Sequence, residues 1–180
     1  MTKYDWLKTI WWMLFIVLAM WMLRTFLFTP VLVKGHSMDP TLHDGEHVIT
    51  LKNQEIKRFD IITFLAPDEP GKSYIKRVIG LPGDTISYVN DHLIINGQTY
   101  NEPYLEKYKQ ELTDGENLTY NFSLVDVIGT HTIPEDTVFV MGDNRRISKD
   151  SRIIGVIDTK VITGDAKLIV WPPKSIGMLE

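Results

Sequence analysis

Residues 74–84 read YIKRVIGLPGD, and this stretch decides the fold of the chain. Its first six residues are rich in the β-branched and aromatic side chains that favour strands, and Pro82-Gly83-Asp84 is a turn signal. The pattern predicts a strand over Tyr74–Ile79 that ends at this turn. Because side chains alternate along a strand, Tyr74, Lys76 and Val78 are expected on one face. The strand therefore carries Lys76 among apolar neighbours.

Strand patterns of the same kind extend on both sides of this stretch. Short β-branched and aromatic runs begin at Val31 and alternate with turn formers such as Asn96-Gly97. Residues 101–123 have no clear period and predict a surface excursion or a small inserted subdomain. We expect one mostly β domain over residues 31–180, a length that supports a substantial core. The other expected strands are His47–Leu51, Asp60–Leu65, Thr85–Val89, His92–Ile95, Val138–Met141 and Lys167–Trp171.

A long apolar segment precedes this domain. Residues 10–28 read IWWMLFIVLAMWMLRTFLF, close to the ~20 residues that cross a bilayer as a helix, with Arg24 as the only charge. We predict a transmembrane anchor there, after a short N-terminus over residues 1–9. A buried core helix is disfavoured because no polar stripe faces water. A cleaved signal peptide is disfavoured because no Ala-x-Ala site follows. Flanking charges nearly tie and do not set the orientation.

Composition excludes several functions. The formal net charge of -4 gives no general attraction to nucleic acid phosphates, so no nucleic-acid partner is expected. The chain has no cysteine, which removes disulfides, thiol nucleophiles and thiolate metal sites. Its histidines form no H-E-x-x-H pattern, and no metal site is predicted. Hydroxyl, amine, imidazole and carboxylate groups remain for chemistry.

Ser37 is the candidate nucleophile. It lies in the run Gly35-His36-Ser37-Met38-Asp39, nine residues after the apolar segment. A serine needs a base, and a lysine kept neutral by apolar surroundings can act as one. Burial lowers a lysine pKa by up to ~3–5 units, which makes Lys76 the candidate base. Taken alone, Lys76 is better explained as a lysine that extends to solvent from a strand edge, and it is the flanking residues that favour a base. His36 is an unsuitable base because neighbours on an extended chain point in opposite directions.

Four segments in this order, after a membrane anchor, resemble the bacterial type I signal peptidases, and among them the Gram-positive type with a single anchor. The serine segment alone would also fit self-cleaving SOS repressors, which use a Ser-Lys pair. The lysine and GDNR segments make the resemblance specific, and it extends to about Gly155. The segments are SMDPTL at 37–42, RFDII at 58–62, YIKRVIGLPGD at 74–84, and GDNR at 142–145 with SKDSR at 148–152.

The resemblance implies a signal-peptidase-like and SOS-repressor-like β fold with a Ser-Lys dyad, in which Ser37 is the nucleophile and Lys76 the general base. Ser148 matches the family serine that hydrogen-bonds this lysine and orients it. Two charged pairs, Asp143 with Arg77 and Asp150 with Arg152, are implied as supports of the site. As exposed ion pairs they would instead contribute only ~0–1 kcal/mol.

The attacked carbonyl oxygen needs fixed donors, and the Ser37 backbone N–H is the expected first one. Some family members add a serine hydroxyl two residues before the nucleophile. Here that position is Gly35, so the second donor is open. Met38 is a candidate for lining a substrate pocket, although packing in the core is equally consistent with its position.

The expected function is removal of signal peptides from exported preproteins at Ala-x-Ala-like sites, through an acyl-enzyme and without a cofactor. The resemblance implies a single-pass protein of the cell membrane, in contact with the bilayer, with the catalytic domain on the extracytoplasmic side. Two alternatives belong to other classes. A self-cleaving repressor would need a DNA-binding domain where the apolar segment stands. A catalytically inactive, membrane-anchored β-domain that binds partners would be expected to lose Ser37 or Lys76.

Overall fold

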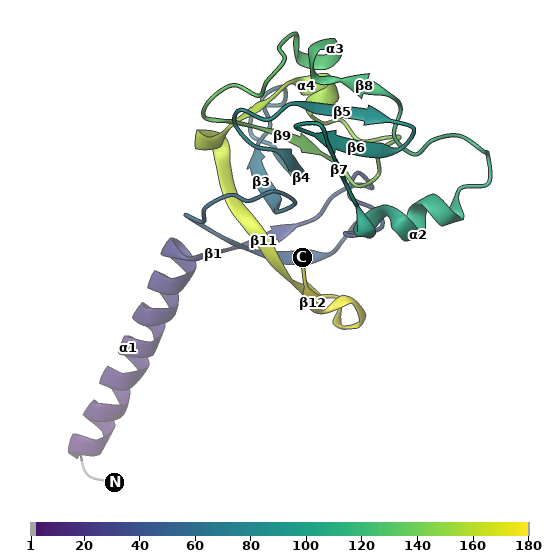
Figure 1. Cartoon of the computed structure of the whole chain (residues 1–180). Coiled ribbons are helices and arrows are strands. Elements are labelled where there is room, and N and C mark those ends of the chain that lie inside the picture. The colour runs from purple at the N-terminus through teal and green to yellow at the C-terminus, as the bar shows by residue number, and fades with distance from the viewer. Residues whose placement is uncertain (1–2, 180) are drawn as a thin grey trace.

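The computed structural model describes residues 3–179. Two antiparallel sheets form most of it, and one long helix projects from them (Figure 1). The larger sheet has eight strands in the order β1-β2-β11-β3-β4-β9-β10, with β12 paired to β11. These strands are β1 (Phe28–Leu32), β2 (His47–Leu51), β3 (Ile61–Leu65), β4 (Ser73–Gly80), β9 (Thr137–Met141), β10 (Ile157–Asp158), β11 (Ile162–Trp171) and β12 (Gly177–Met178).

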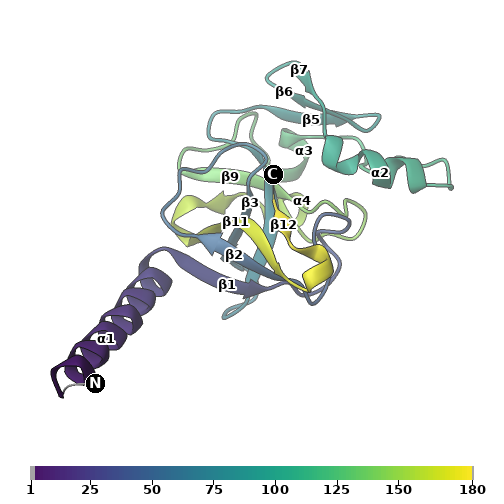
Figure 2. The same ribbon diagram turned by 90° about the horizontal axis from the view of Figure 1, so that it is seen from below.

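The smaller sheet lies against one end of the larger one, with a helix beside it (Figure 2). Its strand order is β7-β6-β5-β8. The segment that the sequence left without a period, residues 101–123, contributes a helix and a strand next to this sheet. The elements are β5 (Ile86–Val89), β6 (His92–Ile95), β7 (Gln98–Tyr100), α2 (Pro103–Glu111) and β8 (Phe122–Ser123). The remaining short helices are α3 (Leu124–Ile128), α4 (Ser151–Ile154), η1 (Thr159–Val161) and η2 (Pro173–Ser175).

Strand β4 is the centre of the fold, as its sequence predicted. It pairs with β3 on one side and β9 on the other, and its last six residues are buried. Ile75 packs in a core with Val48 and Ala166, whereas Val78 packs in a separate core with Phe64 and Val140. Since an apolar core covers each face of the strand, the side chain of Lys76 is buried on either face.

The mostly β fold class is confirmed, and the seven predicted strands all correspond to observed ones. The differences concern the bounds of β11 and several short strands that were not predicted. β11 begins at Ile162 rather than Lys167, with irregular register toward β2 and β3. Strands β8, β10 and β12 have two residues each, too short to show alternation.

Helix α1 spans Lys3–Phe26 and projects away from the sheets (Figure 1). It includes residues 3–9, which were predicted as a separate N-terminus. The predicted anchor extended to residue 28, but Phe28 begins β1 and pairs with Leu51 of β2. Met1, Thr2 and Glu180 lie outside the described residues. Within residues 3–179, no helix has the length and apolar character needed to cross a membrane.

Candidate active site

Ser37 and Lys76 meet across the fold. The Lys76 Nζ lies 2.7 Å from the Ser37 Oγ, although the two residues are 39 positions apart. Lys76 comes from the middle of β4, and Ser37 lies in a turn between β1 and β2. The amine also donates to the Ile75 carbonyl oxygen at 3.0 Å. A hydrogen bond between a hydroxyl and a nearby amine is the geometry that general-base activation requires.

The surroundings of Lys76 favour its neutral form. The side chain is 4% exposed, and burial lowers its pKa from 10.5 to about 8. Asp150 and Asp143 act in the opposite direction, because their negative charges favour the ammonium. The Tyr74 ring lies 5.5 Å from Nζ and covers one side of the amine. About a tenth of such lysines are neutral at pH 7, far more than of exposed lysines.

The turn that carries Ser37 is held by apolar side chains. Met38 and Leu42 are buried in the core with Val48 and Ile61, and the Leu42 N–H donates to the Met38 carbonyl. Ser37, between them and the surface, is half-buried. Of the two interpretations of Met38, the structure favours packing in the core. Its side chain points into the core because the chain turns back there, away from the groove beside Ser37.

The backbone around Ser37 leaves one donor available. The Ser37 carbonyl accepts from the Asn144 N–H at 3.1 Å, whereas the Ser37 N–H makes no hydrogen bond to any described residue. Gly35 adopts a φ of 81°, a left-handed conformation that glycine tolerates best, and its N–H donates to Asp44 Oδ1 at 2.7 Å. Gly35 thus shapes the turn, and the second oxyanion donor stays open.

Ser148 does not make the hydrogen bond that was predicted. Its side chain is buried, and its Oγ has no hydrogen-bond partner in the described structure. The Lys76 amine instead bonds to Ser37 and to the Ile75 carbonyl. Ser148 packs against Gly142, where an added Cβ would overlap both the Ser148 side chain and the Ser37 carbonyl oxygen. Ser148 is thus near the pair but is turned toward Gly142.

Arg77 and Asp143 form a buried pair beside Lys76. Arg77 Nε and Nη2 donate to the two Asp143 carboxylate oxygens at 3.0 and 2.8 Å, and the pair is at most 1% exposed. Thr41, from the serine turn, donates to the same carboxylate at 2.5 Å. Because both charges are buried and fully paired, the alternative of a weak exposed ion pair does not apply. The pair links β4, the GDNR segment and the serine turn.

Asp150 and Arg152 form the second buried pair. Arg152 donates from Nε and Nη2 to the two carboxylate oxygens of Asp150, each at 2.8 Å. Asp150 also accepts from the Gly142 N–H at 2.9 Å and caps the N-terminus of α4. The Arg152 Nη2 donates to the Arg145 carbonyl at 2.8 Å. The pair therefore holds both ends of the loop that follows β9.

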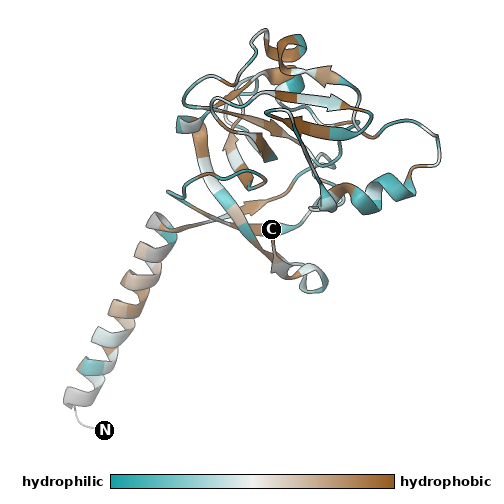
Figure 3. Ribbon diagram, in the orientation of Figure 1, coloured by the Kyte–Doolittle hydropathy of each residue, from teal (hydrophilic) through white to brown (hydrophobic). Residues whose placement is uncertain are grey.

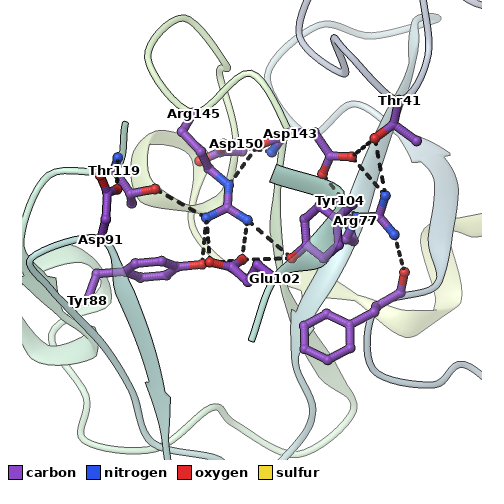
Figure 4. A network of polar contacts seen from close by, with 12 residues as sticks. Thr41, Arg77, Tyr88, Asp91, Glu102, Tyr104, Thr119, Asp143, Arg145 and Asp150 are labelled. Carbon is purple, nitrogen blue, oxygen red and sulfur yellow. Dashed lines mark hydrogen bonds and ion pairs between the residues drawn. The ribbon is translucent and has the colours of Figure 1, made fainter. Parts of the chain in front are cut away.

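A third buried pair was not predicted from the sequence. Arg145 is fully buried and donates to Glu102, while its Nε donates to the Gly142 carbonyl at 3.0 Å (Figure 4). The Tyr88 and Tyr104 hydroxyls donate to the same Glu102 oxygen at 2.8 and 2.7 Å. Glu102 and Tyr104 belong to the region without clear period. No local pattern in the sequence relates Glu102 to Arg145, so no signal there could have revealed the pair.

A groove of about 370 Å³ opens beside Ser37. Residues of its wall include Leu32, Lys34, Ser37, Tyr74, Lys76 and Ile147. The Tyr74 hydroxyl donates to Glu69 Oε1 at 2.5 Å, and this bond holds the pKa of Tyr74 above its ordinary value. A separate hollow of about 500 Å³ between the β2–β3 loop and β11 contains neither Ser37 nor Lys76. Within residues 3–179, no group of three or more His, Asp or Glu side chains is placed to hold a metal.

Known proteins carry the same sequence pattern. Residues 5–171 match the family model described as signal peptidase, peptidase S26. The chain belongs to this family. A signal peptidase I of Bacillus caldolyticus is 45% identical over 159 residues, which cover 86% of either chain. A signal peptidase I of Bacillus licheniformis is 44% identical over 94% of this chain and 89% of the relative.

A solved structure supports the same family. The crystal structure of a signal peptidase I from Enterococcus faecalis is 40% identical and superimposes with a TM-score of 0.59. It matches 62% of this chain and 97% of that one. The resemblance to type I signal peptidases inferred from the four segments is thereby confirmed, and with it the assignment to serine peptidases.

Proposed function

We propose that this chain removes signal peptides from exported preproteins by a serine peptidase reaction in which Ser37 is the nucleophile and Lys76 the general base. The observation that carries the proposal is the 2.7 Å distance between the Lys76 Nζ and the Ser37 Oγ, with the amine buried and its pKa lowered to about 8. Family membership supplies the substrate class. The roles of the individual residues rest on geometry and chemistry.

The reaction follows from these positions. Neutral Lys76 accepts the Ser37 proton while Oγ attacks the scissile carbonyl carbon, and the negative oxygen accepts from the Ser37 N–H. The Lys76 ammonium then gives its proton to the departing amine of the mature protein. A water molecule, deprotonated by Lys76, attacks the resulting ester and releases the signal peptide and Ser37. The three buried carboxylate–arginine pairs keep the backbone around the two groups in place.

The groove beside Ser37 suits an extended chain with small side chains. Its volume of about 370 Å³ is at the lower end of the ~300–1,000 Å³ typical of ligand sites. Leu32 and Ile147 give it an apolar wall, whereas Lys34 and Tyr74 provide polar groups. Bulky residues next to the scissile bond would collide with this wall. We therefore propose Ala-x-Ala-like cleavage sites, as the sequence predicted.

The test of the dyad is cleavage of a signal-peptide substrate by the detergent-solubilised chain. Ser37→Ala and Lys76→Ala are each expected to lower kcat by at least about 10³-fold, as loss of a nucleophile or its base does. Ser175→Ala, in the short helix η2 and outside the groove beside Ser37, is the matched control and should retain parental activity. Parental rates for both site variants would refute the dyad. Absence of cleavage by the parent chain would favour an inactive partner-binding domain.

We also propose that α1 holds the chain at the cell membrane as a single-pass anchor, with the catalytic domain outside the cytoplasm. Apolar residues make up much of α1 (Figure 3). Their side chains are exposed around the helix, including Trp11, Val17 and Met20, each more than 60% exposed. Such a surface is costly in water. Protease added to intact cells should digest the β domain but leave α1 associated with the membrane. Recovery of the chain in the supernatant after carbonate extraction would refute the anchor.

A further inference from the structure

The helix α2 touches the loop that follows β9, which carries GDNR. The Tyr108 hydroxyl donates to Asn144 Oδ1 at 3.0 Å across 36 residues of sequence. Asn144 is 7% exposed, and its own N–H donates to the Ser37 carbonyl at 3.1 Å. Its carbonyl accepts from the N–H of Ser148 at 3.0 Å. Asn144 is thus the single residue that links the Tyr108 side chain on α2 to the main chain of Ser37, the proposed nucleophile.

The helix itself has a firm base. Leu105 is buried, and Glu102, directly before the helix, is held by Arg145 and two tyrosine hydroxyls. Lys109 Nζ donates to the Asp91 carbonyl at 2.8 Å. The Asp91 carboxylate accepts from the N–H groups of Leu118 and Thr119 at 2.7 and 2.6 Å. Because the helix is fixed at several points along its segment, the Tyr108 hydroxyl has a defined position.

A second group of contacts ties the same segment to the same loop. Arg146, which follows Arg145, forms an ion pair with Asp114 and donates to the Glu116 and Asn117 carbonyls. The Thr119 hydroxyl accepts from Arg145 at 3.2 Å. The Tyr104 ring lies 3.9 Å from the Arg77 guanidinium carbon, next to Lys76 in sequence. The segment therefore contacts the loop at three consecutive residues, Asn144, Arg145 and Arg146.

We propose that Tyr108 is a positioning residue for the proposed peptidase site: through the Asn144 side chain it fixes the loop whose backbone N–H holds the Ser37 carbonyl. The inference rests on the proposed function. Misplacing a reacting atom by a fraction of an ångström slows a reaction without weakening substrate binding. The effect of losing the Tyr108 hydroxyl should accordingly fall on kcat and leave KM unchanged.

The test compares Tyr108→Phe with Tyr120→Phe. Both remove one hydroxyl from the same segment, but Tyr120 is 53% exposed and its hydroxyl serves as the control. We expect Tyr108→Phe to lower kcat about 3- to 10-fold, the equivalent of one net hydrogen bond, with KM and Tm close to those of the parent. Tyr120→Phe should match the parent in all three. Peptide cleavage is measured in detergent, well below each variant's Tm.

A double-mutant cycle tests whether Tyr108 acts through the Asn144 side chain. Asn144→Ala keeps the backbone N–H that binds Ser37 but removes the partner of Tyr108. In this background Tyr108→Phe should have no further effect on kcat, because the contact is already lost. If the two substitutions instead lower kcat by the product of their separate factors, the proposal is overturned. A parental kcat for Tyr108→Phe, or a change confined to KM, would also overturn it.

Failure of the inference is distinguishable from failure of the proposed function. The same assay includes Ser37→Ala. If that variant is inactive while Tyr108→Phe cleaves at the parental rate, the peptidase site stands and only the positioning role is refuted. If Ser37→Ala cleaves at the parental rate, the proposed function itself is refuted.

Discussion

The reactivity of a single lysine depends on where its side chain is buried. Lys76 lies on a strand with apolar cores on both faces. Within residues 3–179 its amine contacts Ser37, the Ile75 carbonyl and the Tyr74 ring. The loss of hydration that lowers its pKa is the same for any lysine in such a place. What makes this lysine a candidate base is the hydroxyl 2.7 Å away.

The lowered pKa of Lys76 predicts a particular pH profile. The base must be neutral, so kcat/KM should rise about tenfold per pH unit below pH 8 and level off above it. An unperturbed lysine would place this inflection near ~10.4. Initial rates of peptide cleavage between pH 6 and 10 would measure it, with the exposed Lys107→Gln as control. A profile that keeps rising to pH 10 would contradict the assignment.

Gly142 offers a second test at the residue scale. Any side chain there would overlap the Ser37 carbonyl oxygen and the Ser148 side chain, and the first of these is backbone that cannot move freely. We expect Gly142→Ala to abolish cleavage and to lower the free energy of unfolding by about 1–3 kcal/mol, as overpacking does. Gly177→Ala, where the nearest atom is 3.8 Å away, should be silent in both measurements. Full activity of Gly142→Ala would mean that cleavage does not depend on the present position of the Ser37 backbone.

At the scale of elements, we interpret residues 101–123 as a support for the GDNR loop, which they contact at several points. Glu102 neutralises Arg145 in the interior, and α2 places Tyr104 beside Arg77 (Figure 4). Tyr108, on the same helix, donates to Asn144. The sequence gives no strong pattern there because the segment is held mainly by polar contacts to distant residues. Hydrophobic periodicity, the main signal in a sequence, does not report such contacts.

This supporting role can be tested by comparing how much two ion pairs of the segment contribute to the stability of the fold. Glu102→Ala leaves the Arg145 charge buried without its partner and should lower the free energy of unfolding by about 3–5 kcal/mol. Glu111→Ala removes the partner of Lys107 on the exposed face of α2, where the two groups lie 4.0 Å apart, and should cost at most about 1 kcal/mol. Urea unfolding followed by circular dichroism measures both. Equal costs would show that the Glu102–Arg145 pair is not a structural support.

At the scale of the whole molecule, the core and α1 are separate. The three apolar cores take their residues from the β domain, and the described side chains of α1 from Trp6 to Met22 are almost all exposed. The apolar surface also continues on the sheet, where Phe28, Trp171 and Met178 are exposed. The proposed site lies between β1 and β4, on the sheet to which α1 connects.

Removal of residues 1–26 should therefore separate folding from membrane association. The shortened chain is expected to unfold with a free energy within about 1 kcal/mol of the parent, since surface changes rarely exceed this. It should cleave a short soluble peptide at the parental rate. Cleavage of a vesicle-bound preprotein should fall by about 100-fold, because the enzyme and the substrate no longer share a surface. Equal rates on the vesicle-bound substrate would contradict the proposed anchor.

Much of the fold was predictable from local pattern. Apolar alternation and turn residues located seven of the strands, and the family segments located Ser37, Lys76 and the two predicted charged pairs. The sequence did not fix which way individual side chains point. Met38 turned into the core, and the Ser148 hydroxyl turned toward Gly142 instead of Lys76. The Glu102–Arg145 pair was missed because Glu102 lies outside the four family segments, in a region without hydrophobic periodicity.

The sequence by itself determined the family, the β fold and which residue types carry the chemistry, because these depend on local patterns and on motifs in a fixed order. Only the tertiary structure decided that the Lys76 amine meets the Ser37 hydroxyl, that three carboxylate–arginine pairs are buried around them, and that α2 contacts the GDNR loop. Distances of about 3 Å between residues far apart in sequence result from packing of the whole domain. No local pattern encodes them.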